Sequence, residues 1–265
     1  MRREKSNYII QSVAHALDVV EQFSDDADEL GVTELSKRLK LHKNNVFRLL
    51  ATLESRGYIE QNRSSENYRL GIRCLQLGQS YAQHTGLLRQ AKPVLSELVR
   101  QTRETGYVAV LRRNSMVPID MVDADRAVRI TLPLGDALPM HCTAAGKAYL
   151  AFEPEDEARA LLPDTLPKLT DRTVTDRQAV LQQLKSVVSS GYAVDMGEHI
   201  EDVRAVAVPI RDYTRSLVGA LVVAGPAYRL TGERIEKEIA PQVLKAGREL
   251  SSRLGHDAGA HREPA

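Results

Sequence analysis

Side chains that can read the edges of DNA bases recur in residues 43–52, the string KNNVFRLLAT. Asparagine pairs with the N6/N7 edge of adenine, arginine pairs with O6/N7 of guanine, and an apolar side chain can contact the thymine methyl group. At ~100° per residue, one face of a helix over this string carries Asn44, Asn45, Arg48 and Thr52, with Phe47 at its edge. The opposite face carries valine and leucine. The spacing therefore indicates a helix that packs one face inward and presents the other to DNA.

Two basic residues flank this face. Lys43 stands at the start of the predicted helix, and Arg63 stands at the tip of a predicted hairpin. Lysine and arginine commonly contact phosphate oxygens, which position a protein on a duplex without reading its sequence. An alternative interpretation is that Asn44 and Asn45 only cap the helix and that Arg48 is a solvated surface residue. The elements around the helix favour DNA recognition.

The elements that would position these side chains follow from the spacing of apolar residues. The predicted elements are helices at 9–23, 32–41 and 42–56 and strands at 58–61 and 67–71. Gly57 is expected to end the third helix, because glycine adopts the left-handed conformation that follows a helix end. Helix, helix, turn, helix and hairpin is the order of a winged helix-turn-helix domain, which we assign to residues 7–70.

Charge is distributed unevenly along this domain. The chain has a formal net charge of +1, and Asp18–Glu34 contains seven acids and no Lys or Arg. Lys37–Arg73 contains nine Lys and Arg residues against three acids. A local basic patch matters more for an anionic partner than the global charge does, so the pattern fits double-stranded DNA as the partner.

The bulk composition narrows the class of protein. Its 265 residues are 43% hydrophobic and 27% charged, which is typical of globular proteins. Cys74 and Cys142 are too few for a disulfide framework, so reduced thiols are expected. The N-terminus has no apolar signal segment, and no apolar run approaches the length of a membrane span. We therefore expect a cytoplasmic protein with no membrane partner.

The pattern changes after residue 70. Residues 71–86 are predicted to form a linker helix, with a break near Thr85–Gly86 and Pro93 in the early turn of the next helix. Beyond it, strands are predicted at 107–113, 117–124, 126–133, 205–212 and 216–225, and helices at 144–152, 155–162, 176–191 and 232–255. Residues 87–255 are thus expected to form an α/β (α+β) domain with a mainly antiparallel sheet. A disordered tail is expected at 256–265.

Catalytic chemistry is not supported in this second part. Cys142 follows His141 directly, and adjacent residues rarely face one another, so a nucleophile–base pair is not implied. His199 has no second histidine at metal-ligand spacing, and its charged surroundings, GEHIEDVR, read as a solvated loop. No phosphate-binding or nucleophile-elbow motif is present. We expect no cofactor, no metal and no catalytic residue. An enzyme with an N-terminal regulatory module, and a ligand-binding protein that has lost DNA binding, remain the competing classes.

Four strings, in this order along the chain, resemble the IclR family of bacterial transcription regulators. They are LHKNNVFRLLATLESRGY…NYRLG, LPMHCTAAGKAYLA, GYAVDMGEH and AGPAYRLT, and the resemblance extends over about residues 7–255. It implies a GAF-like C-terminal domain for effector binding and oligomerisation. It also implies a homo-oligomer, a dimer or a dimer of dimers, on a palindromic operator.

By position, the resemblance also implies an effector pocket. Its residues would be Ile130, Leu138, Ala144, Ala145, Asp195, Ala205, Val222 and Ala224. Family members often carry polar residues where this chain has Gly197, Ala205, Val222 and Ala224. A small hydrophilic acid such as glyoxylate would lose partners here, at ~1–3 kcal/mol for each buried polar group left unpaired.

These departures favour an effector with an apolar body. The hypothesis is an aromatic or similar acid, which would point to aromatic catabolism, with Asp195 and the Ala144 and Ala145 amides at its polar end. The alternative is a pocket filled by its own side chains, in a protein that binds DNA constitutively.

Overall fold

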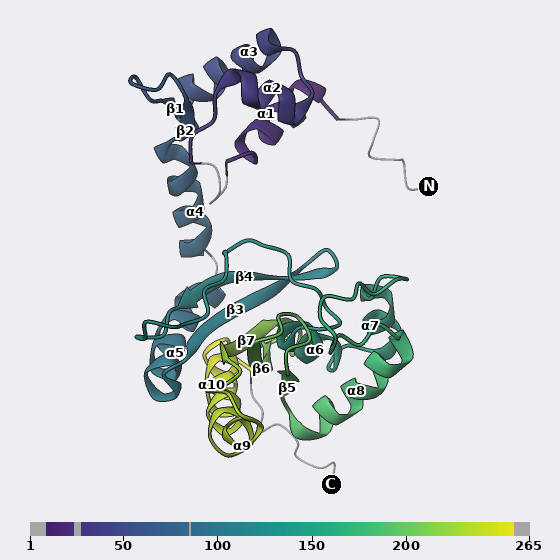
Figure 1. The fold of residues 1–265 in the computed structure, drawn as a ribbon. Helices are drawn as coiled ribbons and strands as arrows, with labels where there is room; N and C mark the ends of the chain where they lie inside the picture. Colours follow the sequence, from purple (N-terminus) through teal and green to yellow (C-terminus); the bar gives the residue numbers. More distant parts are fainter. Residues whose placement is uncertain (1–8, 24–27, 85, 257–265) are drawn as a thin grey trace. The chain divides into compact units, whose positions relative to one another are not determined.

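The computed structural model describes residues 9–23, 28–84 and 86–256. The chain divides into two compact units, Met1–His84 and Thr85–Ala265, which Figure 1 draws in purple to blue and in teal to yellow. Each unit has a hydrophobic core of its own. We describe the units separately.

The first unit is a winged helix-turn-helix, as the sequence predicts. Its elements are α1 (Gln11–Val20), α2 (Val32–Leu39), α3 (Lys43–Ser55), the antiparallel pair β1 (Ile59–Gln61) and β2 (Tyr68–Leu70), and α4 (Ile72–His84). Leu35 of α2, Val46 and Leu50 of α3 and Ile59 of β1 are buried together. Burial of these apolar side chains fixes α3 between α2 and the hairpin.

The positions of the two ends of α3 show which residues cap it. Lys40 adopts a left-handed conformation, and α3 begins at Lys43 with His42 as its N-cap. Asn44 and Asn45 therefore do not cap the helix, so the capping part of the alternative interpretation is wrong. Its other part, that Arg48 is a solvated surface residue, stays open. Gly57 has φ +75°, which confirms its predicted place after the end of α3.

The helix at the start of the unit is shorter than predicted and leaves much of its apolar surface uncovered. Val19 is fully buried in the core. Val13 and Leu17 of α1, and Ile9 and Ile10 just before it, are each more than half exposed. Apolar spacing identified the helix, but most of the residues that set the spacing lie outside the core.

Part of the acidic segment supports the hairpin, which the sequence did not predict. Leu30 forms a β-bridge with Tyr68, with hydrogen bonds of 2.9 and 3.0 Å between their main chains. The Glu29 carboxylate accepts hydrogen bonds from Asn62 Nδ2 and Ser65 Oγ, both at 2.7 Å. These contacts tether the loop that carries Arg63.

The second unit is built on one five-stranded sheet (Figure 1). Its strands, in the spatial order β4-β3-β7-β6-β5, are β3 (Thr105–Arg112), β4 (Ser115–Val122), β5 (Ala193–Asp195), β6 (Val203–Arg211) and β7 (Leu217–Pro226). Every neighbouring pair is antiparallel. The helices are α5 (Gly86–Thr102), α6 (Ala144–Leu150), α7 (Glu155–Leu161), α8 (Arg177–Ser190), α9 (Gly232–Arg234), the π-helical turn η2 (Ile235–Ile239) and α10 (Ala240–Arg253).

Alternation along the central strands separates two cores. Ala205 and Ala207 of β6 face α6 and α8, whereas Val206 and Val208 face α5 and α10. Side chains of successive strand residues point to opposite faces of a sheet, so the run AVAVPI supplies both cores. The mostly antiparallel α/β prediction is confirmed.

Three predictions for this unit are wrong. Residues 126–133 form no strand, and most of their side chains are exposed. The short edge strand β5 was missed, since three residues are too few to show an alternating pattern. Pro93 lies in the middle of α5, not in its first turn. It is tolerated there because Pro93 and Arg89 are exposed, so water can reach the carbonyl that Pro93 leaves without a donor.

Two parts of the predicted organisation fall on residues that the structure does not describe. The described part of α4 ends at His84 and that of α5 begins at Gly86. Thr85 lies outside the described residues, so the break near Thr85–Gly86 stays a prediction. Residues 257–265 of the predicted tail lie outside the described residues. No helix of the described ranges is long and apolar enough to cross a membrane.

Candidate DNA-reading face and effector site

The residues predicted to contact DNA lie on the outer surface of α3 and the hairpin. Lys43, Asn44, Asn45, Phe47, Arg48, Thr52 and Arg63 are all exposed, and the Phe47 ring is 56% exposed. Val46, Leu50 and Leu53 of the same helix are buried. We refer to these seven residues as the α3–wing face.

The polar groups of this face are largely uncommitted. In residues 28–84, the side chains of Lys43, Asn44, Asn45, Arg48 and Arg63 have no hydrogen-bond or ion-pair partner. Thr52 donates its hydroxyl proton to the Arg48 carbonyl, which leaves its oxygen lone pairs as acceptors. Two other arginines of the segment Lys37–Arg73 form ion pairs, Arg38 with Glu34 and Arg69 with Glu60. The α3–wing face therefore carries positive charge, on Lys43, Arg48 and Arg63, that no acidic side chain of residues 28–84 neutralises.

A groove of about 860 Å³ runs between α1 and α3. Val13, His15 and Ala16 line it from α1. Asn45, Phe47, Arg48 and Thr52 line it from α3. The surface that carries the predicted base contacts is thus bordered by the exposed side of α1, which the sequence did not indicate.

The residues predicted to form the effector site are far apart in sequence but adjacent in the second unit. Asp195 of β5 pairs with Ala205 of β6, and Ala205 pairs with Ala224 of β7. Val222 lies two residues before Ala224 on the same face, opposite Tyr107 of β3. All five side chains are buried. They form a row of mostly small side chains across the sheet.

The remaining predicted residues complete this side of the sheet. Ala144 and Ala145 begin α6, which packs on β6 and β7, and both are buried in the same core. Leu138 is buried and bridges Met116, and Ile130 packs against the core while partly exposed. We refer to the eight predicted residues as the effector row.

Thr143 and Gly146 position the start of α6. Thr143 Oγ1 caps the helix by accepting from the Gly146 amide at 3.0 Å. The capping hydroxyl also donates to the Pro139 carbonyl at 2.6 Å. A Cβ atom at Gly146 would lie 2.2 Å from the Met140 carbonyl oxygen, so only glycine allows this approach.

A buried ion pair adjoins the effector row, and sequence reasoning missed it. Lys147 Nζ lies 2.5 Å from Glu198 Oε1, and the two side chains are 5% and 10% exposed. Glu198 Oε2 is buried without a partner among the described residues. Gly197 and Glu198 belong to the charged string interpreted as a solvated loop, and both are buried, so that interpretation is wrong for these two residues. The sequence did offer an indication of this pair: Lys147 stands among small and apolar residues in LPMHCTAAGKAYLA, and a lysine in such a buried segment needs an acidic partner.

Asp195 organises the loop that carries Glu198. Its Oδ1 atom accepts from the main-chain amides of Gly197, Glu198 and His199 at 3.0, 2.7 and 3.4 Å. Burial raises the pKa of the Asp195 carboxyl to about 6, because a charged group is poorly solvated there. The loop amides and Lys147 oppose this rise.

Nearby titratable groups are not arranged for catalysis. Burial raises the pKa of the Cys142 thiol to about 12, so the nucleophilic thiolate is disfavoured at neutral pH. Burial lowers the pKa of His141, whose Nε2 atom donates to the Pro167 carbonyl at 3.0 Å. Across the described parts of the chain, no three His, Cys, Asp or Glu side chains are grouped to hold a metal ion.

Comparison with known proteins assigns both units. Residues 12–63 match the IclR helix-turn-helix domain, and residues 79–252 match the C-terminal domain of the bacterial transcriptional regulator IclR. The chain belongs to the IclR family. The unit with the exposed α3 face is therefore a DNA-binding domain, and the unit with the buried row is an effector-binding domain.

Full-length relatives agree with this assignment. The chain is 34% identical to the transcriptional regulator XynR of Escherichia coli over 254 residues, 94% of this chain and 99% of XynR. It is 32% identical to KdgR of E. coli over 248 residues, 93% of this chain and 94% of KdgR. The crystal structure of an IclR transcriptional regulator from Alicyclobacillus acidocaldarius superimposes with a TM-score of 0.83 at 26% identity, covering 94% and 100% of the two chains. These relatives are regulators, not enzymes.

Proposed function

We propose that this regulator reads a palindromic operator through the α3–wing face and responds to an effector with an apolar body. The observation that carries the first part is the set of exposed polar side chains without partners on α3. Asn44, Asn45 and Arg48 would contact base edges, while Lys43 and Arg63 would contact phosphates. A single α3 reads few base pairs, so two half-sites would be required.

Uncovered apolar side chains support a homo-oligomer. Ile72, Leu75 and Leu77 of α4 are each at least half exposed, as are Val13 and Leu17 of α1. Apolar residues repeated on one element commonly mark a contact with another chain. We propose that these two helices join two copies of the chain, with a dimer or a dimer of dimers as the active form.

The chemistry of the effector row supports an aromatic or similar acid. Ala205, Val222 and Ala224 offer apolar contact, and Asp195 with the Ala144 and Ala145 amides offers polar contact. Burying the apolar body of a ligand contributes ~25 cal/mol per Å². The tight packing of the row also suits the alternative, in which its own side chains fill the site and the protein binds DNA constitutively.

Effector binding would act on DNA binding through α4. An effector changes operator affinity only by binding one arrangement of the dimer better than another, with a coupling of typically ~1–3 kcal/mol. Since α4 directly follows the hairpin, a shift of this helix would alter the spacing of the two half-sites. Whether the effector releases or recruits the protein follows from which arrangement it prefers.

The test is fluorescence anisotropy with the DNA directly upstream of the protein's own gene, against a scrambled duplex of equal length. We expect tight binding that prefers the native duplex and weakens steeply with salt, because phosphate contacts release counterions. Equal, weak binding to this duplex and to duplexes selected from a random pool would contradict operator reading. Adding benzoate, 4-hydroxybenzoate or glyoxylate then tests the effector. Tight glyoxylate binding without any response to aromatic acids would refute an apolar-bodied effector.

A further inference from the structure

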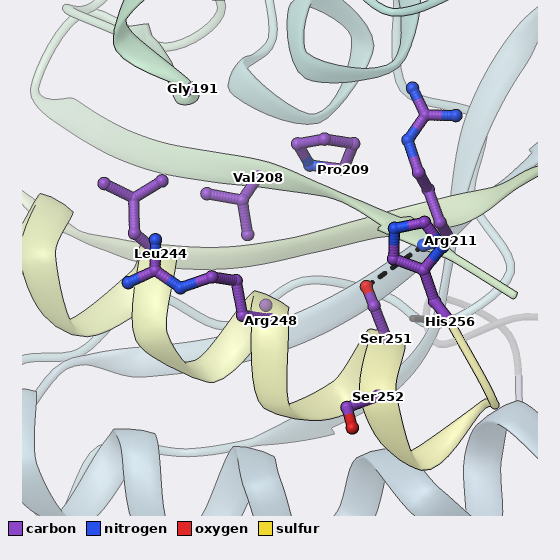
Figure 2. Close-up of a pocket in the computed structure, with 10 residues that line it drawn as sticks. Gly191, Val208, Pro209, Arg211, Leu244, Arg248, Ser251, Ser252 and His256 are labelled. Carbon is purple, nitrogen blue, oxygen red and sulfur yellow. Dashed lines mark hydrogen bonds between the residues drawn. The ribbon is translucent and has the colours of Figure 1, made fainter. Parts of the chain in front are cut away.

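A cavity opens in the effector-binding unit, at the edge of β6 and beside α10 (Figure 2). Its volume is about 380 Å³, within the range of roughly 300–1,000 Å³ of small-molecule sites. It is lined by Gly191, Val208, Pro209, Arg211, Leu244, Gly247, Arg248, Ser251, Ser252 and His256. None of these residues belongs to the effector row, and we call this cavity the α10 cleft.

The cleft exists because a strand stops short. β5 pairs only with Ala205–Ala207, so beyond Ala207 this edge of β6 has no strand neighbour in the described part of the chain. Pro209 has no N–H to offer an added strand, which disfavours edge pairing with another chain. The Arg211 amide donates instead to Ser251 Oγ of α10 at 3.1 Å (Figure 2). The open edge therefore faces a hollow suited to a small molecule.

Three polar groups of the lining can bond a ligand, and one of their atoms is buried without a partner. Ser251 is 6% exposed, and its hydroxyl retains a proton to donate after accepting from Arg211. His256 is held by a hydrogen bond of 2.9 Å from its amide to the Ser251 carbonyl, and its Nδ1 atom is buried without a partner. The exposed Arg248 guanidinium has no partner among the described residues. Buried polar groups are nearly always hydrogen-bonded, so the buried Nδ1 atom of His256 indicates a missing polar partner.

The charged residues that line the α10 cleft favour an anionic ligand. No Asp or Glu is among the lining residues. The guanidinium of Arg211 points away from Ser251 (Figure 2), donates to the Arg215 carbonyl and lies over the Phe152 ring. Arg248 is thus the available cation. The acids next to lining residues are engaged elsewhere, Asp212 with Thr214 and Glu249 with Arg253.

We propose that the α10 cleft binds a small organic carboxylate with an apolar body, as a second ligand site separate from the effector row. The Arg248 guanidinium matches a planar carboxylate, and the Ser251 hydroxyl and His256 imidazole can donate beside it. Val208, Pro209 and Leu244 provide apolar contact for the body. Val208 belongs to the core under α10, whereas Ala205 of the effector row belongs to the core under α6.

The test uses 4-bromobenzoate and the full-length protein without DNA. Calorimetry compares the wild type with Arg248→Gln, and with Lys245→Gln as a matched loss of charge on the exposed surface of the same helix. Arg248→Gln should weaken one binding event by about tenfold or more, as expected for a charge-assisted hydrogen bond, and Lys245→Gln should not. Arg248→Lys keeps the charge but not the planar guanidinium, so its affinity for 4-bromobenzoate should lie between those of the wild type and Arg248→Gln. Because Arg248 is exposed, unchanged melting curves verify that the variants are folded.

Anomalous scattering from bromine in crystals grown with 4-bromobenzoate then locates the ligand. A bromine peak in the α10 cleft, together with the loss specific to Arg248, supports the proposal. Bromine at the effector row alone overturns it and leaves the proposed effector intact. A peak in the cleft with equal affinity in all variants means binding at crystal concentration only, and overturns it too. Equal weakening by Arg248→Gln and Lys245→Gln would assign the effect to general surface charge, which also contradicts the proposal.

Discussion

At the scale of single residues, Arg48 is the sharpest test of base reading. Its side chain is exposed on α3, without a partner among the described residues, at the centre of the α3–wing face. Arg48→Ala should cost ~1–3 kcal/mol of operator binding and relax the preference at one base pair. Anisotropy with duplexes substituted one position at a time measures both effects.

Lys43 provides the comparison for Arg48. Lys43→Ala removes a predicted phosphate contact, so it should weaken all duplexes alike and reduce the salt dependence by about one counterion. If Arg48→Ala behaved in the same way, Arg48 would be a phosphate contact and not a base reader.

Asp195 gives a prediction on pH, because burial raises its pKa to about 6. The folded protein holds this proton more tightly than the unfolded chain, so charging Asp195 costs stability above pH 6, and the cost disappears as the pH falls towards 4. Asp195→Asn keeps an acceptor for the loop amides without the charge. Its gain over the wild type should reach about 1–3 kcal/mol at pH 7.5 and shrink by pH 5.

Denaturant unfolding of both proteins at each pH measures this difference. The comparison with the wild type at the same pH is essential, because His141 and His199 also make stability depend on pH. Burial lowers the pKa of both imidazoles, so they lose stability as the pH falls while Asp195 regains it. A gain that is independent of pH would show that the Asp195 carboxyl keeps its ordinary pKa.

At the scale of elements, the hairpin depends on a residue outside it. Hydrogen bonds from Asn62 and Ser65 hold the pKa of the Glu29 carboxyl below its ordinary value. Glu29→Gln weakens both contacts and should free the loop that carries Arg63. We expect faster hydrogen exchange at the Ser64 amide and weaker operator binding with an unchanged base preference.

Asp28→Asn is the matched control, since it removes the same charge one residue earlier. Asp28 is exposed and has no hydrogen-bond or ion-pair partner among the described residues. If both variants accelerated exchange equally, the acidic segment would act on the hairpin through its charge and not through the Glu29 contacts.

At the scale of the whole molecule, exposed apolar residues on α1 and α4 lead to the prediction that the chain does not act alone. Leu75 is 56% exposed on α4. Leu75→Glu should dissociate the oligomer, because burying an unpaired charge at an apolar contact is costly. Light scattering should give a multiple of 29.4 kDa for the wild type and 29.4 kDa for the variant, with operator affinity falling accordingly.

Gln76→Glu, which adds the same charge at the next exposed position, should leave the oligomer intact. Dissociation of both variants would indicate that charge anywhere on α4 disrupts assembly. A wild-type mass of 29.4 kDa at the concentrations used for DNA binding would contradict the proposed dimer.

Most of the local structure is determined by the sequence. Apolar spacing defines α2, α3 and α10, Gly57 ends α3, and the Asn and Arg residues of α3 lie on the face opposite Val46 and Leu50. These features depend on residues within a few positions of one another, so helical periodicity and turn chemistry suffice to predict them. The family strings added the effector row, whose members lie on three strands, on α6 and in the segment between β4 and α6.

Only the tertiary structure determines which of these features meet. The row formed by Asp195, Ala205 and Ala224 depends on strand register, and the Lys147–Glu198 pair joins residues 51 positions apart. Residues 126–133 have a strand-like composition, yet β4 remains the sheet edge and no partner strand stabilises them. Long-range pairing decides these outcomes, because a strand or a buried charge is stable only when a partner elsewhere in the chain satisfies it.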